Sequence, residues 1–471
     1  MKKLLDTNKI TLGEYIGYGI GPVGKNMMSS LVNGEYLPNF FRTQLQISNG
    51  FLAVMLFASK IWDGANDLLM GAIIDHTSSK WGKFRPWIFF GAIFNAITSV
   101  MIYFDPGFKG IWIYIYVTLL YLLCDATFTM IDVGYWSMIP AMTLDPKERD
   151  KLSVLPRVTG AVGGLASAFT LNIVGFLGKE DTAKGYLRYA FIAAVVYITT
   201  SVICAASTRE RVVLTPRQKE PFSFVRAARI LFRNDQALIV VAVMILFNAA
   251  ACMHGGTMLY YFTNVLLKPN SYAFYSILAG VIGGIGLFGV PLASKKFERN
   301  KVYLSTYLLP CLGYLLMTVG NSVAPSNFLV FAVSGLIPQI SYGAMSMMQS
   351  VMLSDAVDYG EWKYGERNEG IIFSMLTFLS KISNGISYFI RYSCFAAVKF
   401  DTQVGVATTT AAVRMIKILL FGVPPIFLLG AYVLHRAKFR LTPGFMSEII
   451  SEIKERRAAL SSNDGNGVHE K

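Results

Sequence analysis

Two aspartates stand one helical turn apart in the apolar stretch FASKIWDGANDLLMG. Asp63 and Asp67 are spaced i and i+4, so an α-helix places both carboxylates on one face, with Asn66 beside them. Two carboxylates close together in an apolar wall repel each other unless a cation or a shared proton lies between them. We therefore predict a site for a small cation, Na⁺ or H⁺, at this position. The structural alternative is that one aspartate only pairs with a lysine, such as Lys60 or Lys381.

A second polar stripe occurs in TFTMIDVGYWSMIP. Thr129, Asp132 and Trp136 are spaced i, i+3 and i+7, which places them on one helical face. A carboxylate beside an indole can bind a sugar, because sugar hydroxyls donate to the acid and the apolar sugar face stacks on the ring. A tryptophan alone is more often a packing residue, but its pairing with Asp132 favours a sugar site. Asp125 lies one heptad before Asp132, and it is either a further site carboxylate or a cavity-lining residue.

Two basic residues also require an explanation. Lys381 lies inside an apolar stretch, FLSKISNG, where a lysine needs a carboxylate partner. We expect that partner among the acids of the two stretches above. Arg157 stands near the start of another apolar segment, where it can also anchor the end of a loop.

The composition identifies the kind of chain that positions these residues. Hydrophobic residues make up 54% of the 471 residues, charged residues 15%, and the mean hydropathy is +0.46, as in a membrane protein. A helix needs roughly 20 apolar residues to cross a bilayer. The net charge of +14 comes from basic residues between apolar segments, which favours membrane topology over nucleic-acid binding. The five cysteines are isolated within apolar runs and are predicted to be packing residues.

Twelve apolar segments are predicted to be transmembrane helices. Several of them also carry Gly, Asn, Asp, Ser, Thr and Tyr, so we expect these to line an interior cavity. The segments are 11–41, 48–74, 87–104, 111–142, 152–178, 186–206, 237–267, 272–293, 302–320, 328–357, 370–398 and 413–435.

The loops predict the orientation and the division of the chain. Lys and Arg are concentrated after the second, fourth, sixth, eighth and tenth segments, which places these loops and both termini in the cytoplasm. The loops after the second and eighth segments match, GAIIDHTSSKWGKFRP and GVPLASKKFERNKVYL, as do those after the fourth and tenth. We expect an all-α membrane protein of two pseudo-symmetric six-helix bundles, the major facilitator fold. The predicted parts are an N-terminal bundle (1–206), a cytoplasmic central loop (207–236), a C-terminal bundle (237–436) and a partly disordered cytoplasmic tail (437–471).

The chain resembles a known family in specific strings. KIWDGANDLLMGAIIDHTSSKWGKFRPWI, MIDVGYWSMIPAMTLDPKERD, SDAVDYGEWK and Lys381 are similar to the glycoside-pentoside-hexuronide:cation symporters, from Tyr15 to about Lys438. The resemblance implies a secondary active symporter of the cell (inner) membrane that works by alternating access. Its partners would be a sugar or glycoside, a coupling cation (Na⁺, H⁺ or Li⁺) and the lipid bilayer. It implies no other cofactor, no enzyme activity and function as a monomer.

The resemblance also implies residue roles. The cation site would comprise Asp63, Asn66, Asp67 and Thr129, with Na⁺ possible at the two aspartates and Lys381 as a nearby charge partner. The sugar site would comprise Lys25, Asn26, Asp132, Trp136 and Arg157, and a cytoplasmic gate would pair Asp355, Asp358 and Glu361 with the loop that contains Arg149.

One position departs from the family. Melibiose-type members carry an aspartate after the first-helix lysine, whereas this chain has Asn26. The loss of a negative charge next to Lys25 favours an anionic substrate, and we expect a glucuronide or a similar hexuronide. A neutral glycoside or pentoside is the close alternative.

Other classes of protein fit the sequence less well. A membrane-embedded enzyme is disfavoured because the four histidines are far apart and HGGTM at His254 has no accompanying G-x-S-x-G. A channel is the second alternative, and paired halves with charge clusters on several helices favour a carrier. The G-x-G-x-x-G of Gly19, Gly21 and Gly24 follows no strand, so it is not a dinucleotide loop. Glycines spaced by four residues instead predict close helix packing.

Overall fold

The computed structural model describes residues 10–143, 145–212, 224–324, 328–365, 369–401, 403 and 406–466, and within these ranges the chain forms helices and no strand. The chain divides into two compact units. The first unit comprises Met1–Glu220, Leu259–Ile277 and Tyr388–Met415. The second comprises Pro221–Met258, Leu278–Ser387 and Ile416–Lys471.

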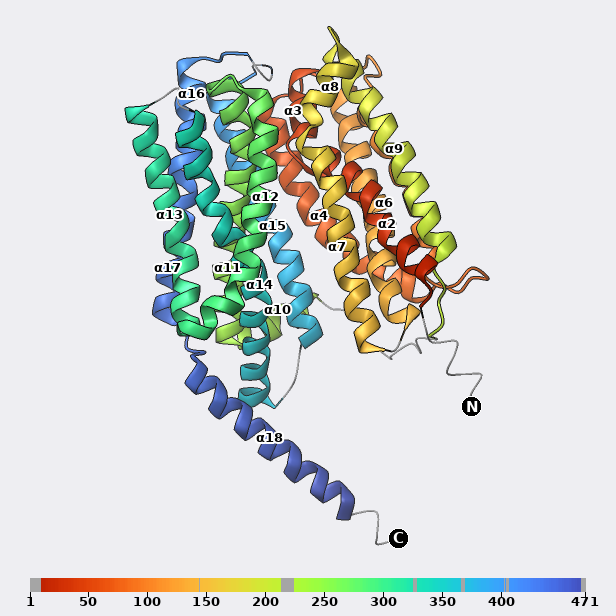
Figure 1. The fold of residues 1–471 in the computed structure, drawn as a ribbon, viewed down its shortest axis with the longest axis vertical. Helices are drawn as coiled ribbons and strands as arrows, with labels where there is room; N and C mark the ends of the chain where they lie inside the picture. Colours follow the sequence, from red (N-terminus) through yellow and green to blue (C-terminus); the bar gives the residue numbers. More distant parts are fainter. Residues whose placement is uncertain are drawn as a thin grey trace. The chain divides into compact units, whose positions relative to one another are not determined.

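The first unit contains the predicted cation and sugar residues. Figure 1 shows α2, α4, α6, α7 and α9 running alongside one another, and the closest packed pairs are α2 with α9, α2 with α7, and α5 with α6. Its helices are α2 (Leu12–Asn33), α3 (Tyr36–Thr43), α4 (Asn49–Asp75), α5 (Arg85–Met101), α6 (Ile111–Met142), α7 (Pro146–Ala168), α8 (Thr170–Gly178), α9 (Thr182–Ser207) and the π-helix η2 (Tyr261–Val265).

Glycines allow α2 and α9 to approach closely. A methyl group on Gly24 would lie 2.4 Å from the Cα of Tyr197, and one on Gly17 would lie 2.2 Å from the Cβ of Ser207. Gly13, on the same helix, has nothing within 4 Å of such a methyl group. Of the glycines spaced by four residues, Gly17 and Gly21 are therefore closely packed and Gly13 is not, and Gly24 is a further close contact.

A short hydrogen-bonded loop starts α5. The carboxylate of Glu210 accepts hydrogen bonds from the backbone N–H groups of Lys83 (2.7 Å), Phe84 (2.8 Å) and Arg85 (3.1 Å). Gly82 has a φ of +106°, and a side chain there would meet the Glu210 carboxylate at 2.4 Å. A carboxylate thus satisfies the free N–H groups at the start of a helix whose positive dipole end favours a negative charge.

Segments from late in the chain complete the first unit. Arg391 is fully buried and forms an ion pair with Glu35, whose other carboxylate oxygen accepts from the Tyr392 hydroxyl at 3.1 Å. Asn49, at the start of α4, donates to the backbone carbonyl of Phe400 at 2.5 Å. These buried polar contacts account for the inclusion of Tyr388–Met415 in this unit.

The second unit is built from the remaining helices. The α13 and α14 helices form its most extensive helix pair, and α13 also packs on α17. Its helices are α10 (Phe224–Arg233), α11 (Asp235–Tyr260), α12 (Pro269–Lys296), α13 (Arg299–Val323), α14 (Phe328–Tyr364), α15 (Glu369–Ala397), α16 (Thr410–Lys417), η3 (Ile418–Gly422), α17 (Val423–Lys438) and α18 (Pro443–Asn466). Of these, α11, α12, α15 and α16 each have one end in the first unit.

Seven helices in the described part of the chain are long and apolar enough to cross a membrane, and the bent pair α7 and α8 adds an eighth. This confirms an integral multi-pass membrane protein. Each of the twelve predicted segments also contains a helix. Four of these helices are not among those that are long and apolar enough to cross a membrane: α2, α4, α5 and α15. The number of twelve spans therefore stays a prediction, as do the two six-helix halves, which do not coincide with the two compact units.

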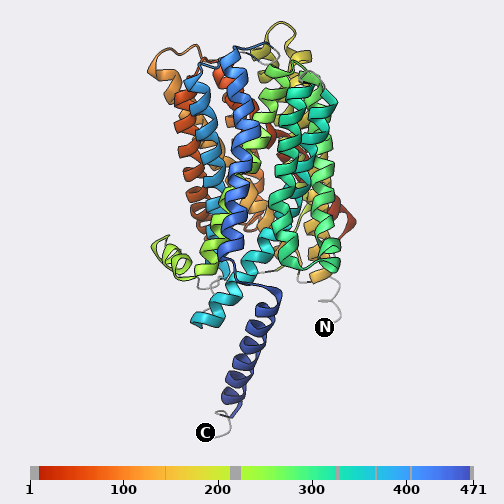
Figure 2. The ribbon, with the colours of Figure 1, turned by 90° about the vertical axis from the view of Figure 1, so that its left-hand side faces the viewer.

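The predicted cytoplasmic tail contains a helix. Pro443–Asn466 forms α18, which projects away from the other helices of its unit (Figure 2). Its apolar side is buried at Met446, Ile449 and Ile453. The indole N–H of Trp362, near the end of α14, donates to Glu452 at 2.7 Å. Residues 467–471 lie outside the described residues.

Candidate cation and sugar site

Two packed helices, α4 and α6, bring the predicted cation residues together. Ser48 caps the start of α4 by accepting from the backbone N–H of Phe51 at 3.3 Å. One face of α4 then carries Asp63 and Asp67. The hydroxyl of Thr129, on α6, donates to Oδ1 of Asp67 at 3.2 Å. The structure therefore brings together an aspartate from one helix and a hydroxyl from the other, as oxygen ligands for a small cation require.

Asp63 has a resident partner on its own helix. The Nζ of Lys60 lies 3.5 Å from Oδ2 of Asp63, and both side chains are largely buried. This lysine was named in the sequence analysis only as a structural alternative. The pair does not remove Asp63 from the cation site, but any incoming cation must share this carboxylate with an ammonium group.

Asn66 lies between the two aspartates along α4. Its side chain is 5% exposed, and its Nδ2 has no hydrogen-bond partner among the described residues. A buried amide without a partner is costly, by about 1–3 kcal/mol. The side chain is thus available to a ligand, consistent with its predicted place in the cation site.

The predicted sugar residues centre on an ion pair between α2 and α6. The Nζ of Lys25 lies 2.5 Å from Oδ1 of Asp132, with the lysine buried and the aspartate half-exposed. The same ammonium lies over two aromatic rings, 5.0 Å from the centre of Tyr135 and 5.4 Å from the centre of Trp136. Trp136 is 39% exposed, so its ring can be reached by a ligand.

Tyr135 was not predicted from the sequence. Its ring stacks on Tyr18 of α2 with centroids 4.4 Å apart, and each hydroxyl donates to the other residue's backbone carbonyl. This double contact fixes the position of α2, and so of Lys25, against α6. A tyrosine next to Trp136 was visible in the sequence, but its partner lies 117 residues away.

The structure assigns Asn26 a packing contact. Its Nδ2 donates to the backbone carbonyl of Gly160 on α7 at 3.1 Å, and a methyl group on Gly160 would lie 2.5 Å from that nitrogen. Arg157, on the same helix as Gly160, is exposed. The amide of Asn26 is therefore held by α7, and its role towards a sugar stays a prediction.

The residues predicted for the cytoplasmic gate belong to two different units. Arg149 is in the first unit, where its Nε donates to the carbonyl of Thr143 at 2.9 Å. Asp355 is in the second unit and forms an ion pair with Arg299, a residue that the sequence analysis missed. The predicted gate, which also includes Asp358 and Glu361, and the partner of Lys381 stay predictions.

A polar cluster in the second unit was also missed. The Nε2 of Gln349 on α14 donates to Oδ1 of Asn248 on α11 at 3.0 Å, and Nδ2 of Asn248 donates to the Ser380 hydroxyl at 3.3 Å. Ser380 directly precedes Lys381 on α15. The sequence carried a weak signal, since all three are polar residues inside apolar segments.

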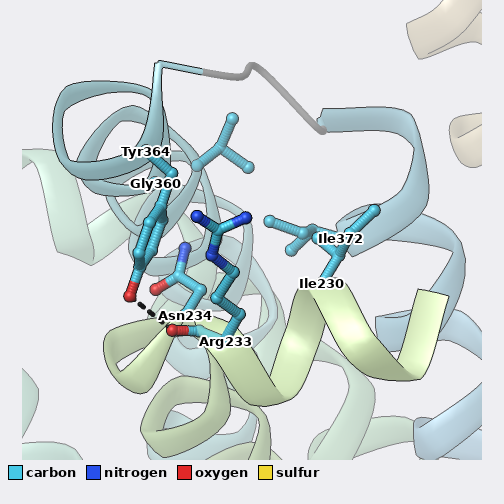
Figure 3. A pocket seen from close by; sticks show the side chains of 7 residues that line it. Ile230, Arg233, Asn234, Gly360, Tyr364 and Ile372 are labelled. Atoms are coloured by element: carbon cyan, nitrogen blue, oxygen red, sulfur yellow. Dashed lines mark hydrogen bonds between the residues drawn. The ribbon is translucent and has the colours of Figure 1, made fainter. Parts of the chain in front are cut away.

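Figure 3 shows a separate small cavity in the second unit. It has a volume of about 30 Å³, between α10, α14 and α15. Arg233 stacks on Tyr364 at 4.6 Å, and the tyrosine hydroxyl donates to the Arg233 carbonyl at 2.5 Å. Such a volume holds about one or two water molecules and is too small for a sugar. None of the predicted site residues lines it.

The described residues form a multi-pass helical membrane protein with carboxylates at the interface of two packed helices, which has the characteristics of a membrane carrier. The chain belongs to the MFS/sugar transport protein family, whose model matches residues 17–442. The family assignment confirms the predicted relationship to glycoside-pentoside-hexuronide:cation symporters.

Curated relatives cover nearly the whole chain. The inner membrane symporter YicJ of Escherichia coli (strain K12) is 27% identical over 453 residues, 95% of each chain. The putative glycoside/cation symporter YagG of the same organism is 27% identical over 96% of each chain. The isoprimeverose transporter of Lactiplantibacillus pentosus is 28% identical and covers 81% of this chain and 80% of its own.

Solved structures support the fold. The crystal structure of a D-xylose-proton symporter matches 92% of this chain and 98% of its own with a TM-score of 0.59, at 12% identity. At that identity the similarity establishes the major facilitator fold and carries no information on the substrate.

Proposed function

We propose that this protein is a secondary active symporter that couples uptake of a glycoside, pentoside or hexuronide to a cation by alternating access. The observation that carries the proposal is the arrangement on α6. Thr129 contacts the cation-site carboxylate Asp67, and Asp132, three residues further on, pairs with Lys25. Family membership supports it, because relatives are named as symporters of this kind.

The coupling between the two ligands follows from this arrangement. A cation between Asp63 and Asp67 neutralises repulsion on α4 and draws the Thr129 oxygen towards it. That contact fixes α6 at the level of Asp132, where the sugar hydroxyls bind. Coupling free energies are reciprocal, so the sugar increases cation affinity by the same factor.

The charges around the sugar residues favour an anionic substrate. Lys25 and Arg157 contribute two positive charges and Asp132 one negative charge, which leaves a net charge of +1. Asn26 adds no carboxylate. A glucuronide-type carboxylate can pair with Arg157, which is exposed and forms no ion pair among the described residues. A neutral pentoside is the second candidate, supported by the isoprimeverose transporter among the relatives.

The coupling cation is Na⁺, H⁺ or Li⁺, and Asp63 with Asp67 permits each of them. The inner membrane is supported by the relative YicJ, which is named as an inner membrane symporter. Cytoplasmic termini are supported by the basic loops that follow the even-numbered segments. The protein works as a monomer, binds no nucleic acid and catalyses no reaction.

Uptake by proteoliposomes tests the function. Purified protein is given labelled phenyl-glucuronide, methyl-xyloside or methyl-galactoside under imposed Na⁺, Li⁺ or H⁺ gradients. The proposal requires saturable, gradient-dependent uptake of at least one sugar. Uptake of neutral glycosides with none of the glucuronide would contradict the anionic substrate and retain the symporter, whereas non-saturable flux would indicate a channel.

A further inference from the structure

Lys60 lies among acidic groups from two helices. Its side chain on α4 is 9% exposed, and its Nζ lies 3.5 Å from Asp63. The same Nζ lies 5.9 Å from the ring centre of Tyr121 on α6. Asp125 is 4% exposed, stands one helical turn after Tyr121, and is an electrostatic partner of Lys60 together with Asp63.

The spacing of side chains along α4 and α6 shows which residues of the two helices lie at the same height. On α4, Lys60, Asp63 and Asp67 follow one line at i, i+3 and i+7. On α6, Asp125 and Thr129 follow a line at i and i+4. Thr129 contacts Asp67 and Tyr121 lies near Lys60, so α4 and α6 run in the same direction. Asp125, one turn before Thr129, therefore lies at about the level of Asp63, one turn before Asp67.

The ammonium and a coupling cation compete for the same carboxylate. Asp63 is needed with Asp67 to surround the cation, but in this structure it is shared with Lys60. A second positive charge beside a bound cation is repulsive in a site that excludes water. Lysine has a flexible stem of four carbons and a compact charge, so it can change partner without movement of its helix.

We propose that Lys60 is a resident cation that holds Asp63 while the site lacks its coupling cation and transfers to Asp125 when that cation binds. Asp125 is then a positioning residue: it touches neither sugar nor cation and determines how readily Asp63 is released. The inference rests on the proposed function, since it assumes a coupling cation at Asp63 and Asp67.

A static role for Asp125 makes a different prediction. If Asp125 were only a permanent counter-ion, its loss would leave a buried lysine uncompensated and lower stability, with no selective effect on cation affinity. In the transfer mechanism, its loss leaves Lys60 on Asp63 and weakens cation binding. Removal of the ammonium in the same protein then restores that binding.

The test measures apparent cation affinity of the full-length protein. Thermal unfolding of purified protein is followed while NaCl or LiCl is titrated against choline chloride, and proton affinity is read from the same signal against pH. The variants are Asp125→Asn, Asp125→Glu, Lys60→Gln and the double variant Asp125→Asn with Lys60→Gln. Asp105→Asn is the matched control, because it removes an exposed loop aspartate of the same unit.

The transfer mechanism predicts a specific pattern. Asp125→Asn weakens cation affinity by about tenfold or more, Asp125→Glu and Asp105→Asn leave it within about twofold, and the double variant recovers most of the loss. Unchanged affinity in Asp125→Asn, or no recovery in the double variant, overturns the inference. If Asp125→Asn does not fold, the cation affinity of Lys60→Gln tests the inference. The inference requires the Lys60→Gln variant to bind the cation at least as tightly as the original protein, and weaker binding overturns it. A wild-type protein with no cation response and no cation-driven uptake refutes the proposed function and this inference with it.

Discussion

The hydroxyl of Thr129 donates a 3.2 Å hydrogen bond to the carboxylate of Asp67 across the α4–α6 interface. Three residues further along α6, Asp132 forms its ion pair with Lys25 of α2. A single helix therefore carries one contact of the predicted cation site and one of the predicted sugar site. A change at one contact is therefore expected to affect the other through α6.

Replacement of Asp67 by Asn is expected to abolish cation-driven uptake. The amide keeps the size of the side chain but removes the charge that attracts the cation, and we expect gradient-driven uptake to fall by about 100-fold or more. Initial rates in proteoliposomes measure it. Glu180→Gln, at an exposed position of the same unit, is the control. Cation-driven uptake that survives in Asp67→Asn would show that the cation site has been misassigned.

Replacement of Lys25 by Met is expected to weaken an anionic substrate more than a neutral one. The variant removes a positive charge and leaves Asp132 without its 2.5 Å partner. An anionic sugar also loses the attraction of the ammonium and should bind about tenfold or more weakly, whereas a neutral sugar loses only hydrogen bonds. Competition between phenyl-glucuronide and methyl-xyloside compares the two losses. Equal losses for both sugars would argue that Lys25 only positions Asp132.

A glycine pair on α2 offers a matched test of helix packing. Gly24→Ala places a methyl group 2.4 Å from the backbone of Tyr197, and we expect destabilisation of about 1–3 kcal/mol. Gly13→Ala has nothing within 4 Å and is expected to be neutral or stabilising by up to about 1 kcal/mol. Thermal unfolding in detergent measures both. Equal melting temperatures would contradict the close α2–α9 approach.

The buried ion pair of Glu35 and Arg391 is expected to show strong non-additivity. Glu35→Gln removes a countercharge of the fully buried Arg391, and loss of one member of such a pair costs about 3–5 kcal/mol. The double variant Glu35→Gln with Arg391→Met removes both charges and should be more stable than Glu35→Gln alone. A double-mutant cycle of unfolding free energies measures the coupling, and additive effects would count against the pair.

Loss of the Glu210 carboxylate is expected to loosen the start of α5. Glu210→Gln weakens three hydrogen bonds to backbone N–H groups, and we expect a loss of about 1–2 kcal/mol, as for a helix cap. Hydrogen exchange at residues 83–85 reports the effect locally. Glu448→Gln, on the exposed side of α18, should leave that exchange unchanged.

The sequence predicted much of this architecture because long apolar segments and spacing along a helix are local properties. Asp63 and Asp67 lie on one face of α4, and Thr129 and Asp132 follow each other on α6, as their spacing required. Contacts between residues far apart in the chain could not be predicted from the sequence. Nothing in the spacing shows that Asn26 meets Gly160, 134 residues later, because that pairing depends on how α2 and α7 pack.

The sequence also did not decide between alternative partners for one residue. Lys60 and Lys381 were both candidates for a carboxylate, and only the three-dimensional arrangement places Lys60 on Asp63. The helix at Pro443–Asn466 was missed because its polar composition conceals the spacing of Met446, Ile449 and Ile453. The first case is a choice between a lysine three residues away and one more than 300 residues away. The second depends on contacts with α14, such as that of Glu452 with Trp362.

The contact between Asn26 and Gly160 limits which residues can occupy either position. An aspartate at position 26 would turn a carboxylate towards the Gly160 carbonyl, in place of an amide that donates to it, and two acceptors repel at 3.1 Å. A larger residue at position 160 would meet the side chain of Asn26 at 2.5 Å. Each position therefore restricts the other. Replacement of Asn26 by aspartate would therefore need a second substitution on α7 to restore the contact, and we expect the single variant to be less stable than the original protein.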